Sequence, residues 1–358
     1  SYMKKKMRRK TVALMMTAAL AVTGCLTGCG SSSDSADNGE LNIFIWTEYV
    51  PDSVIEKFED ETGIKVNVST FSSNEDMLAK VQAEASDAYD IVQPSDYMVQ
   101  RMIEQDMLAE LDKDALPNLS NIGEQYLNPS YDPGNVYSVP YQGGVAAIAV
   151  NTDMVDIDID SYADLFDPSL KDSLVVLDDY RAVIGMTARS MGYSMNETDP
   201  AHLQEISDKL MTLKPNIKLY DSDSPKSALI SGDCAVGMVW NAEIALAMEE
   251  NDSIEIVYPK EGPYVFMDNW AVMKDSPNYD NAMTFINFMM DPDVVQMVLE
   301  EFPYLNPNTT AVEAMGEEYS SNLAKNPPAE VIASGEYVQN LDVDTLAIYD
   351  EMWTQLKQ

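Results

Sequence analysis

Short apolar runs alternate with longer segments in which apolar residues recur every three or four positions. Three of these runs predict strands, at residues 41–46, 64–68 and 90–92. Two helices are predicted between them, one opened by Pro51 and Asp52 and ended by Gly63, the other over residues 73–86. This β-α-β-α-β order predicts an α/β fold with a largely parallel sheet.

The same alternation returns in the second half of the chain. Further strands are predicted at residues 174–177, 235–240 and 254–258. Helices are predicted from about Arg181, after a cap at Asn241, over residues 281–302 with an interruption near Pro292, and over residues 344–356. About 320 residues of this kind suggest two domains or lobes.

The first forty residues do not follow this pattern. A basic cluster at residues 4–10 precedes an apolar run at residues 12–22, then small residues and a Ser/Asp/Gly-rich stretch at residues 31–39. This order predicts a secretory signal peptide. The apolar run is too short to span a bilayer as a stable anchor.

The sequence before Cys29 resembles the signal of bacterial lipoproteins, which is an apolar residue, two small residues and a cysteine. The resemblance implies that residues 1–28 are removed and that lipid is attached to Cys29. Residues 29–40 would then be a flexible tether to the outer face of the cytoplasmic membrane, or within a periplasm if the organism has two membranes. Cys25 is the alternative lipidation site, since a second such motif precedes it.

Charge narrows the classes of partner. The formal net charge of the chain is −38, and removal of residues 1–28 leaves 16 Lys and Arg against 60 Asp and Glu, or −44. Such a chain repels nucleic acid and attracts cations. A hydrophobic content of 46% with 19 Tyr fits a globular protein and not a disordered acidic tail.

Residues that carry catalysis or bind metals are scarce. The chain has one histidine, His202, which nearly excludes Ser-His-Asp and Cys-His catalysis and most zinc sites. Cys234 stands in an apolar run and is interpreted as a buried core residue. We therefore expect no enzyme, no metal site and no cofactor.

Aromatic residues stand beside carboxylates where several predicted strands end. Examples are Trp46 with Glu48 and Tyr49, Tyr97 with Asp96, and Phe266 with Asp268. Ligands of open α/β sheets bind beyond the carboxyl ends of strands. Aromatic faces attract an organic ammonium group, and carboxylates give it charge-assisted hydrogen bonds. The pattern favours a site for an organic cation.

Segments that include these aromatic and acidic residues resemble the bacterial spermidine/putrescine-binding proteins of polyamine ABC transporters. The matching segments follow the family order over nearly the whole mature chain: residues 42–63, 89–95, 137–141, 178–179, 237–241, 259–262, 267–268 and 304–308. The resemblance implies a two-lobed fold of the periplasmic-binding-protein type (type II) with the ligand in a cleft between the lobes. Lobe one would be residues 41–144 and 266–313, and lobe two residues 145–265 and 314–358.

Carried over by position, the resemblance implies a ligand-binding set made of aromatic, hydroxyl, amide and acidic side chains. Its members are Trp46, Thr47, Glu48, Tyr49, Ser95, Tyr97, Asp179, Trp240, Phe266, Asp268, Tyr304 and Gln339. Two positions depart from the spermidine-binding pattern, with Ala182 in place of Glu and Phe266 in place of Trp. Because both changes weaken the hold on a cation, we expect putrescine to be favoured over spermidine or at least to compete with it. Glu243 or Asp96 could compensate.

The implied function is a monomeric, lipid-anchored receptor that captures polyamine and delivers it to an ABC permease. Three alternatives stay open: a receptor of the same fold for another small organic cation or solute, an enzyme on the same scaffold, and a structural surface protein or adhesin. An anionic solute would require Arg or Lys in the cleft, and only Arg181 lies near these motifs.

Overall fold

The first three strands form a parallel unit, as the apolar runs predict. The structure, a computed structural model, describes residues 38–358. Strand β1 (Glu40–Trp46) pairs in parallel with β2 (Lys65–Phe71) on one side and β3 (Ile91–Val92) on the other. Helix α1 (Asp52–Thr62) ends at Gly63, whose φ of 70° lies in the left-handed region that glycine adopts without strain.

The second half of the chain builds a similar parallel unit. Strand β5 (Leu174–Val176) lies between β6 (Ile217–Tyr220) and β7 (Val236–Trp240) and is parallel to both. Helix α4 (Tyr180–Ser190) follows β5, so the predicted strand–helix order is confirmed here.

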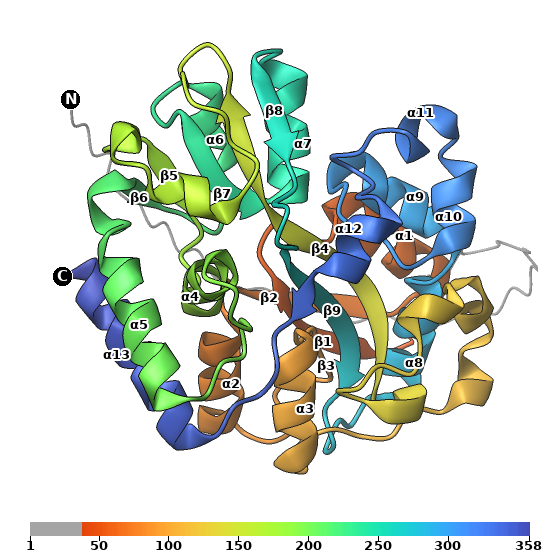
Figure 1. The fold of residues 1–358 in the computed structure, drawn as a ribbon. Coiled ribbons are helices and arrows are strands. Elements are labelled where there is room, and N and C mark those ends of the chain that lie inside the picture. Colours follow the sequence, from red (N-terminus) through yellow and green to blue (C-terminus); the bar gives the residue numbers. More distant parts are fainter. Residues whose placement is uncertain (1–37) are drawn as a thin grey trace, which may run out of the picture. The chain divides into compact units, whose positions relative to one another are not determined.

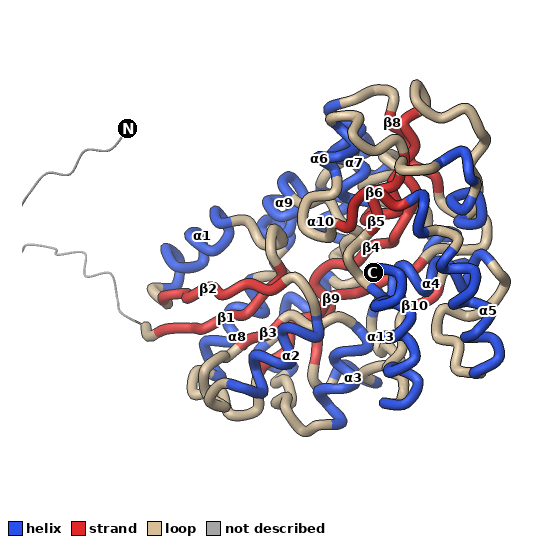
Figure 2. Tube along the Cα trace, turned by 90° about the vertical axis from the view of Figure 1, so that its left-hand side faces the viewer, coloured by secondary structure: helices blue, strands red, loops and turns tan. Residues whose placement is uncertain are grey.

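Two long buried strands join the parallel units. Strand β4 (Ser138–Asn151) pairs antiparallel with β9 (Tyr264–Val272), with β7 and with β8 (Ile254–Val257), and β9 also pairs antiparallel with β3. The strand order is β2-β1-β3-β9-β4-β7-β5-β6. In Figure 2, β1 and β2 lie at one end of the strands and β5 and β6 at the other, with β9 and β4 between them. The sheet is therefore mixed and not largely parallel. It is parallel within each βαβ unit, where helices make the crossovers, and antiparallel at its centre.

Strand β10 (Glu336–Tyr337) also belongs to the sheet, where it pairs in parallel with β9. The other α-helices are α2 (Asn74–Ala83), α3 (Asp96–Glu104), α5 (Pro200–Met211), α6 (Lys226–Ile230), α7 (Asn241–Glu250), α8 (Tyr279–Phe288), α9 (Pro292–Glu301), α10 (Thr309–Ala314), α11 (Glu317–Ser320), α12 (Ala329–Ser334) and α13 (Val343–Lys357). The break predicted near Pro292 separates α8 from α9. Helix α13 packs against α4 and α5, far from the helices α8 to α10 that precede it (Figure 1).

The predicted helix cap at Asn241 is wrong. Helix α7 has Trp240 at its N-cap, without a side-chain capping bond. The Asn241 side chain is buried and bridges two other segments: its Oδ1 accepts from the Val145 N–H at 3.1 Å, and its Nδ2 donates to the Ala324 carbonyl at 2.9 Å. A buried amide satisfies more polar groups as this bridge than as a cap.

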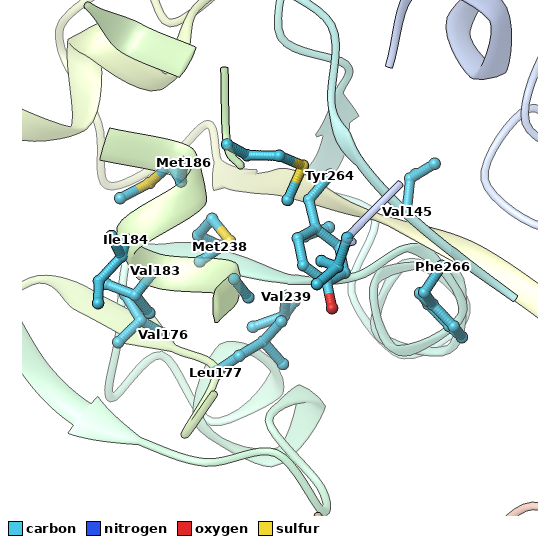
Figure 3. Packing of buried hydrophobic residues seen from close by; sticks show 14 of the residues in the cluster. Val145, Val176, Leu177, Val183, Ile184, Met186, Met238, Val239, Tyr264 and Phe266 are labelled. Carbon is cyan, nitrogen blue, oxygen red and sulfur yellow. The ribbon is translucent and has the colours of Figure 1, made fainter. Parts of the chain in front are cut away.

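Apolar packing fixes the sheet against its helices. Figure 3 shows Val176 and Leu177 beside Val183 and Ile184 of α4, with Met238 of β7 close by. All five side chains are fully buried. A fully buried aliphatic side chain contributes about 1.5–3 kcal/mol, so this contact holds the N-terminus of α4 firmly at the end of β5.

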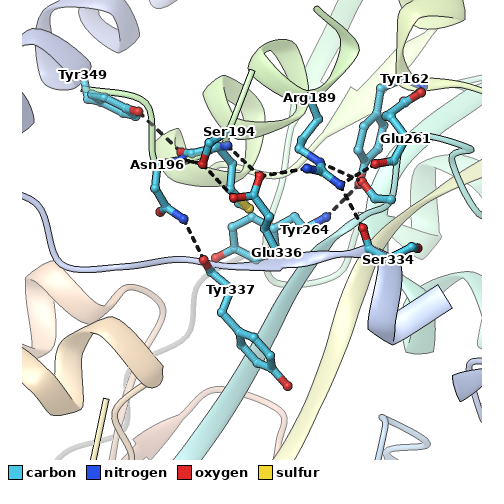
Figure 4. Close-up of polar contacts among 12 residues, drawn as sticks. Tyr162, Arg189, Ser194, Asn196, Glu261, Tyr264, Ser334, Glu336, Tyr337 and Tyr349 are labelled. Carbon is cyan, nitrogen blue, oxygen red and sulfur yellow. Dashed lines mark hydrogen bonds and ion pairs between the residues drawn. The ribbon is translucent and has the colours of Figure 1, made fainter. Parts of the chain in front are cut away.

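One arginine fastens the segment that leads to α13. The Arg189 guanidinium of α4 donates to Glu336 Oε1 at 3.0 Å, to the Ser334 carbonyl at 2.9 Å and to the Gly262 carbonyl at 3.3 Å (Figure 4). It also donates to the carbonyl of Glu261. The planar guanidinium can hold several acceptors at once, so Arg189 ties three chain segments together.

The predicted lobe boundaries stay a prediction, since the contacts of Asp37–Gln358 form one compact unit. The signal peptide, the lipidation site at Cys29 or Cys25 and most of the tether lie outside the described residues. Among the described residues, no helix is both long and apolar enough to cross a membrane.

Candidate ligand-binding site

A single cavity collects almost all the predicted site residues. It has a volume of about 500 Å³ and is lined by aromatic, acidic and hydroxyl side chains from both parallel units and from β9. Eleven of the predicted residues line it: Trp46, Thr47, Glu48, Tyr49, Ser95, Tyr97, Asp179, Trp240, Phe266, Asp268 and Tyr304. The carboxyl ends of β1, β5 and β7 meet there, as expected for a ligand site of an α/β sheet.

The aromatic side chains form a connected wall. The ring centroids of Tyr49 and Tyr304 lie 5.0 Å apart, those of Phe266 and Tyr304 6.2 Å, and those of Trp240 and Phe266 4.8 Å. All three pairs meet edge to face, the arrangement that aromatic quadrupoles favour. Such a wall accepts a methylene chain along its faces and attracts a cation.

Trp46, which also lines the cavity, is fixed by its backbone and by its ring. Its backbone N–H donates to Gln93 Oε1 at 3.0 Å, and its indole Nε1 donates to the Gln93 carbonyl at 2.9 Å. The ring also lies 4.7 Å from that of Phe71 at the end of β2. The indole is therefore oriented before any ligand arrives.

Asp268 is the most deeply buried acid of the cavity, at 3% exposure. Its Oδ1 accepts from the Ser95 hydroxyl, which itself accepts from Asn74 Nδ2 at 3.0 Å. The buried Tyr49 hydroxyl faces the same carboxylate but is not aligned with it for a full hydrogen bond. Burial raises the pKa of Asp268 to about 7, against the opposing effect of the two hydroxyls.

Asp179 is the second acid. It caps the N-terminus of α4, accepting from the Ala182 N–H at 3.0 Å. Burial, then the nearby charge of Glu75, raises the pKa of Asp179 to about 6. Glu75 in turn accepts from the Tyr97 hydroxyl at 2.6 Å. With Asp268, the cavity thus holds two carboxylates that a cation would help to ionise.

Thr47 and Glu48 lie at the exposed side of the cavity. The Thr47 hydroxyl donates to the Phe71 carbonyl at 3.1 Å. Glu48 has a φ of 51°, a left-handed conformation that costs free energy for any residue with a Cβ. The turn after β1 therefore places the Glu48 carboxylate at the cavity although the left-handed backbone conformation of Glu48 is unfavourable.

Gln339 does not join this group. It lines a separate, smaller cavity of about 190 Å³, and its backbone carbonyl accepts from Arg181 Nη1 at 3.0 Å. Asp96 and Glu243 also fail to reach the main cavity. Asp96 accepts from the Met267 N–H at 3.1 Å, and Glu243 pairs with Lys226, at 3.4 Å between Nζ and Oε1.

The cavity has further lining residues that sequence reasoning missed. They are Phe71, Ser72, Ser73, Asn74, Glu75, Asp76, Asp178, Tyr180, Tyr220, Asp221, Ser222, Asp223, Tyr264, Asp350, Trp353 and Lys357. Asp178 could have been found, because it precedes Asp179. The pattern of α13 gives no sign that Trp353 and Lys357 face a cavity, since both fit an ordinary amphipathic helix. Among the described residues, no cluster of three or more His, Cys, Asp or Glu is arranged to hold a metal ion.

Comparison with known proteins places this geometry in context. The sequence profile of the bacterial extracellular solute-binding proteins matches residues 53–328. The spermidine/putrescine-binding periplasmic protein of Salmonella typhimurium is 40% identical over 339 residues, which cover 94% of this chain and 97% of that protein.

Two solved structures share the fold. The spermidine/putrescine ABC transporter substrate-binding protein PotD from Streptococcus pneumoniae has a TM-score of 0.78 and 35% identity, covering 89% of this chain and 99% of that chain. The TpPotD lipoprotein of Treponema pallidum has a TM-score of 0.78 and 27% identity, covering 88% and 99%.

Proposed function

This chain belongs to the bacterial extracellular solute-binding proteins, and from that premise we propose that its cavity captures polyamines outside the cytoplasm for an ABC transporter. Polyamines are aliphatic chains with two or more ammonium groups. The similar proteins from Salmonella typhimurium and Streptococcus pneumoniae are described as spermidine/putrescine-binding. The protein acts as a receptor in this proposal and not as an enzyme.

The observation that carries the proposal is the buried Asp268 carboxylate at one side of an aromatic wall. No Lys or Arg among the described residues forms an ion pair with it. A buried carboxylate without a cation is unfavourable, and a ligand ammonium would remove that cost. The rings of Trp240, Phe266 and Tyr304 suit the methylene chain between two ammonium groups.

We expect putrescine to be favoured over spermidine or at least to compete with it. Ala182 and Phe266 stand where a carboxylate and an indole are typical of spermidine-binding proteins. Ala182 is fully buried and its N–H is bound by Asp179, so its side chain offers no contact to a ligand. Loss of a carboxylate disfavours a trication more than a dication.

Closure of two lobes around the amine would complete the mechanism. The central strands β4 and β9 run between the two parallel units, and residues of both units line the cavity. A bound amine would draw the units together, and the closed form would present the surface that the permease recognises. We propose a monomer for this role.

Anchoring by lipid at Cys29 is part of the proposal. The proteins with a similar fold include one described as a lipoprotein. Mass spectrometry of the protein purified from membranes should find a diacylated N-terminal cysteine at position 29. Cys29→Ser should release the protein from the membrane, whereas the same result with Cys25→Ser alone would move the site to Cys25.

The test of binding is calorimetric titration with putrescine, spermidine and, as a control, arginine. The protein is first unfolded and refolded to remove any amine carried through purification. One-to-one binding of either polyamine, with no binding of arginine, supports the proposal, and the putrescine-to-spermidine ratio tests the role of Ala182 and Phe266. Binding of neither polyamine to folded protein would refute it.

A further inference from the structure

The outer part of the cavity already holds an alkylammonium group, and that group belongs to the protein. The Lys357 ammonium of α13 lies 5.1 Å from the ring centroid of Trp353 and 5.1 Å from that of Tyr220. The two rings are 5.6 Å apart and perpendicular to each other. The same ammonium is 2.6 Å from Asp178 Oδ1. We call Asp178, Tyr220 and Trp353 the outer cage.

The outer cage repeats the chemistry of the inner cavity. Two aromatic faces and a carboxylate surround a primary ammonium on a four-carbon chain, which is the end group of an aliphatic polyamine. Asp221, Asp223 and Asp350 line the same cavity, and among its described lining residues Lys357 is the one cationic side chain. Lys357 alone does not balance this acidity.

A purely structural role explains less of this arrangement. The ion pair is exposed, with 37% of the Lys357 side chain and 47% of the Asp178 side chain accessible, and exposed pairs contribute about 0–1 kcal/mol. A lysine near a helix C-terminus is favoured by the helix dipole, but that effect requires neither aromatic rings nor extra carboxylates. A weakly held ammonium in an acidic aromatic cage can be displaced by another.

We propose that the outer cage is a second alkylammonium subsite, which Lys357 fills when no ligand reaches it. A ligand with a third ammonium must displace Lys357 to enter, whereas a short diamine held at the inner acids does not. Lys357 therefore acts as a tethered competitor and favours diamines over triamines. This inference rests on the proposed polyamine function and names the residue that sets ligand length.

The test compares Lys357→Gln with Lys325→Gln. Lys325 is the matched control, because its ammonium also pairs with a carboxylate, Glu249 at 2.6 Å, and lies 6.0 Å from an aromatic ring, that of Tyr319, but it does not line the cavity. In Lys357→Gln, spermidine affinity relative to putrescine should rise by roughly 3–10-fold, the range of one displaced ion pair and cation–π contact. Lys325→Gln should leave the ratio unchanged.

A second variant tests the cage itself. Adding Asp178→Asn to Lys357→Gln should abolish the gain in spermidine affinity, because the carboxylate that receives the third ammonium is gone. Asp178 is exposed, so the variant should fold as the parent does. Equal changes for both amines in Lys357→Gln, or weaker spermidine binding, would overturn the proposal.

One measurement tests the second alkylammonium subsite independently of the proposed polyamine-binding function. The indole N–H resonance of Trp353, assigned by its absence in Trp353→Phe, is followed during titration with n-butylammonium chloride. It should shift in Lys357→Gln and much less in the parent. If the parent binds no polyamine, the proposed function fails, but the shift of the Trp353 resonance still tests the second subsite. Absence of this shift in Lys357→Gln would refute the second subsite.

Discussion

Asp268 shows how burial prepares a single side chain for a cationic ligand. Its carboxylate lies at 3% exposure with two hydroxyl neighbours, and its pKa is raised to about 7. Near neutral pH a large share of the molecules therefore carries a protonated Asp268. A ligand ammonium favours the ionised form, so binding should release protons.

The pH dependence of affinity follows from this coupling. With a pKa of about 7, Asp268 is ionised in roughly a tenth of the molecules at pH 6 and in most of them at pH 8. Affinity for putrescine should therefore be about tenfold weaker at pH 6 than at pH 8 through Asp268 alone, and Asp179, with a pKa of about 6, should add to the loss as the pH falls below about 7. Calorimetry in two buffers of different ionisation enthalpy measures both the affinity and the proton release. A flat profile between pH 6 and pH 8 would contradict this account of Asp268.

Asp268→Asn should weaken putrescine binding and at the same time raise the stability of the ligand-free protein. Loss of a buried partner for an ammonium should weaken putrescine binding by about 3 kcal/mol, or roughly 100-fold. Asp96→Asn is the control, because Asp96 is equally buried and its pKa is also raised, but it does not line the cavity.

Asp268→Asn should be more stable than the parent protein when no ligand is bound. The pKa of Asp268 is higher in the folded chain than in the unfolded chain, so ionisation destabilises the fold as pH rises from about 4 through 7. At pH 8 Asp268→Asn should gain on the order of 1–3 kcal/mol in urea unfolding, and near pH 4 the gain should vanish. A loss of stability at pH 8 would show that the ionised carboxylate supports the fold.

The strand ends indicate only part of the site, whereas Phe266 and Asp268 within β9, and Tyr304 after α9, were predicted from the family resemblance. Trp46 and Trp240 each end a strand, and Asp179 stands three residues after the end of β5. Gln339 was predicted only from the family resemblance, and it lies in the irregular connection at residues 338–342, where the apolar pattern does not indicate where a side chain points. Trp353 and Lys357 were missed because only the packing of α13 against α4 and α5 brings them to the cavity.

Among the elements, the segment around β10 is tied to the rest of the fold by Arg189 as well as by its pairing with β9. Arg189 binds Glu336, Ser334 and the turn at Gly262, which belong to segments far apart in sequence. Arg189→Ala should lower the free energy of unfolding by about 2–4 kcal/mol, because it leaves partly buried acceptors without a donor. Urea unfolding measures the loss.

Arg189→Lys is the informative partner of that variant. It keeps the charge but cannot reach all the acceptors at once, so it should restore less than half of the lost stability. Full recovery with lysine would show that charge alone matters. No loss with alanine would mean that the segment is held by its other contacts.

The positions of strands and helices were easier to predict than the hydrogen bonds and strand pairings between them. The strands from β1 to β3 and the break between α8 and α9 follow from the apolar pattern and from Pro292. Asn241 was wrong as a cap, since the sequence cannot show that Val145 and Ala324 would need its amide. The antiparallel centre of the sheet was also missed, because the direction of pairing is set by the whole chain path.

Seen as a whole, the molecule places its cavity where two parallel βαβ units meet around β4 and β9. The proposed lobe closure predicts that putrescine reduces the radius of gyration of the stripped protein in solution X-ray scattering. Asp268→Asn at the same putrescine concentration should stay at the ligand-free value. Identical scattering of the parent with and without bound putrescine would exclude closure of the two units.

The most direct test of the ligand site is a crystal structure of the stripped protein with putrescine. We predict one ammonium nitrogen within about 3 Å of an Asp268 carboxylate oxygen and the methylene chain against Trp240, Phe266 and Tyr304. Putrescine bound elsewhere, or an Asp268 that keeps only its contacts to Ser95 and Tyr49, would contradict the assignment of this cavity as the polyamine site.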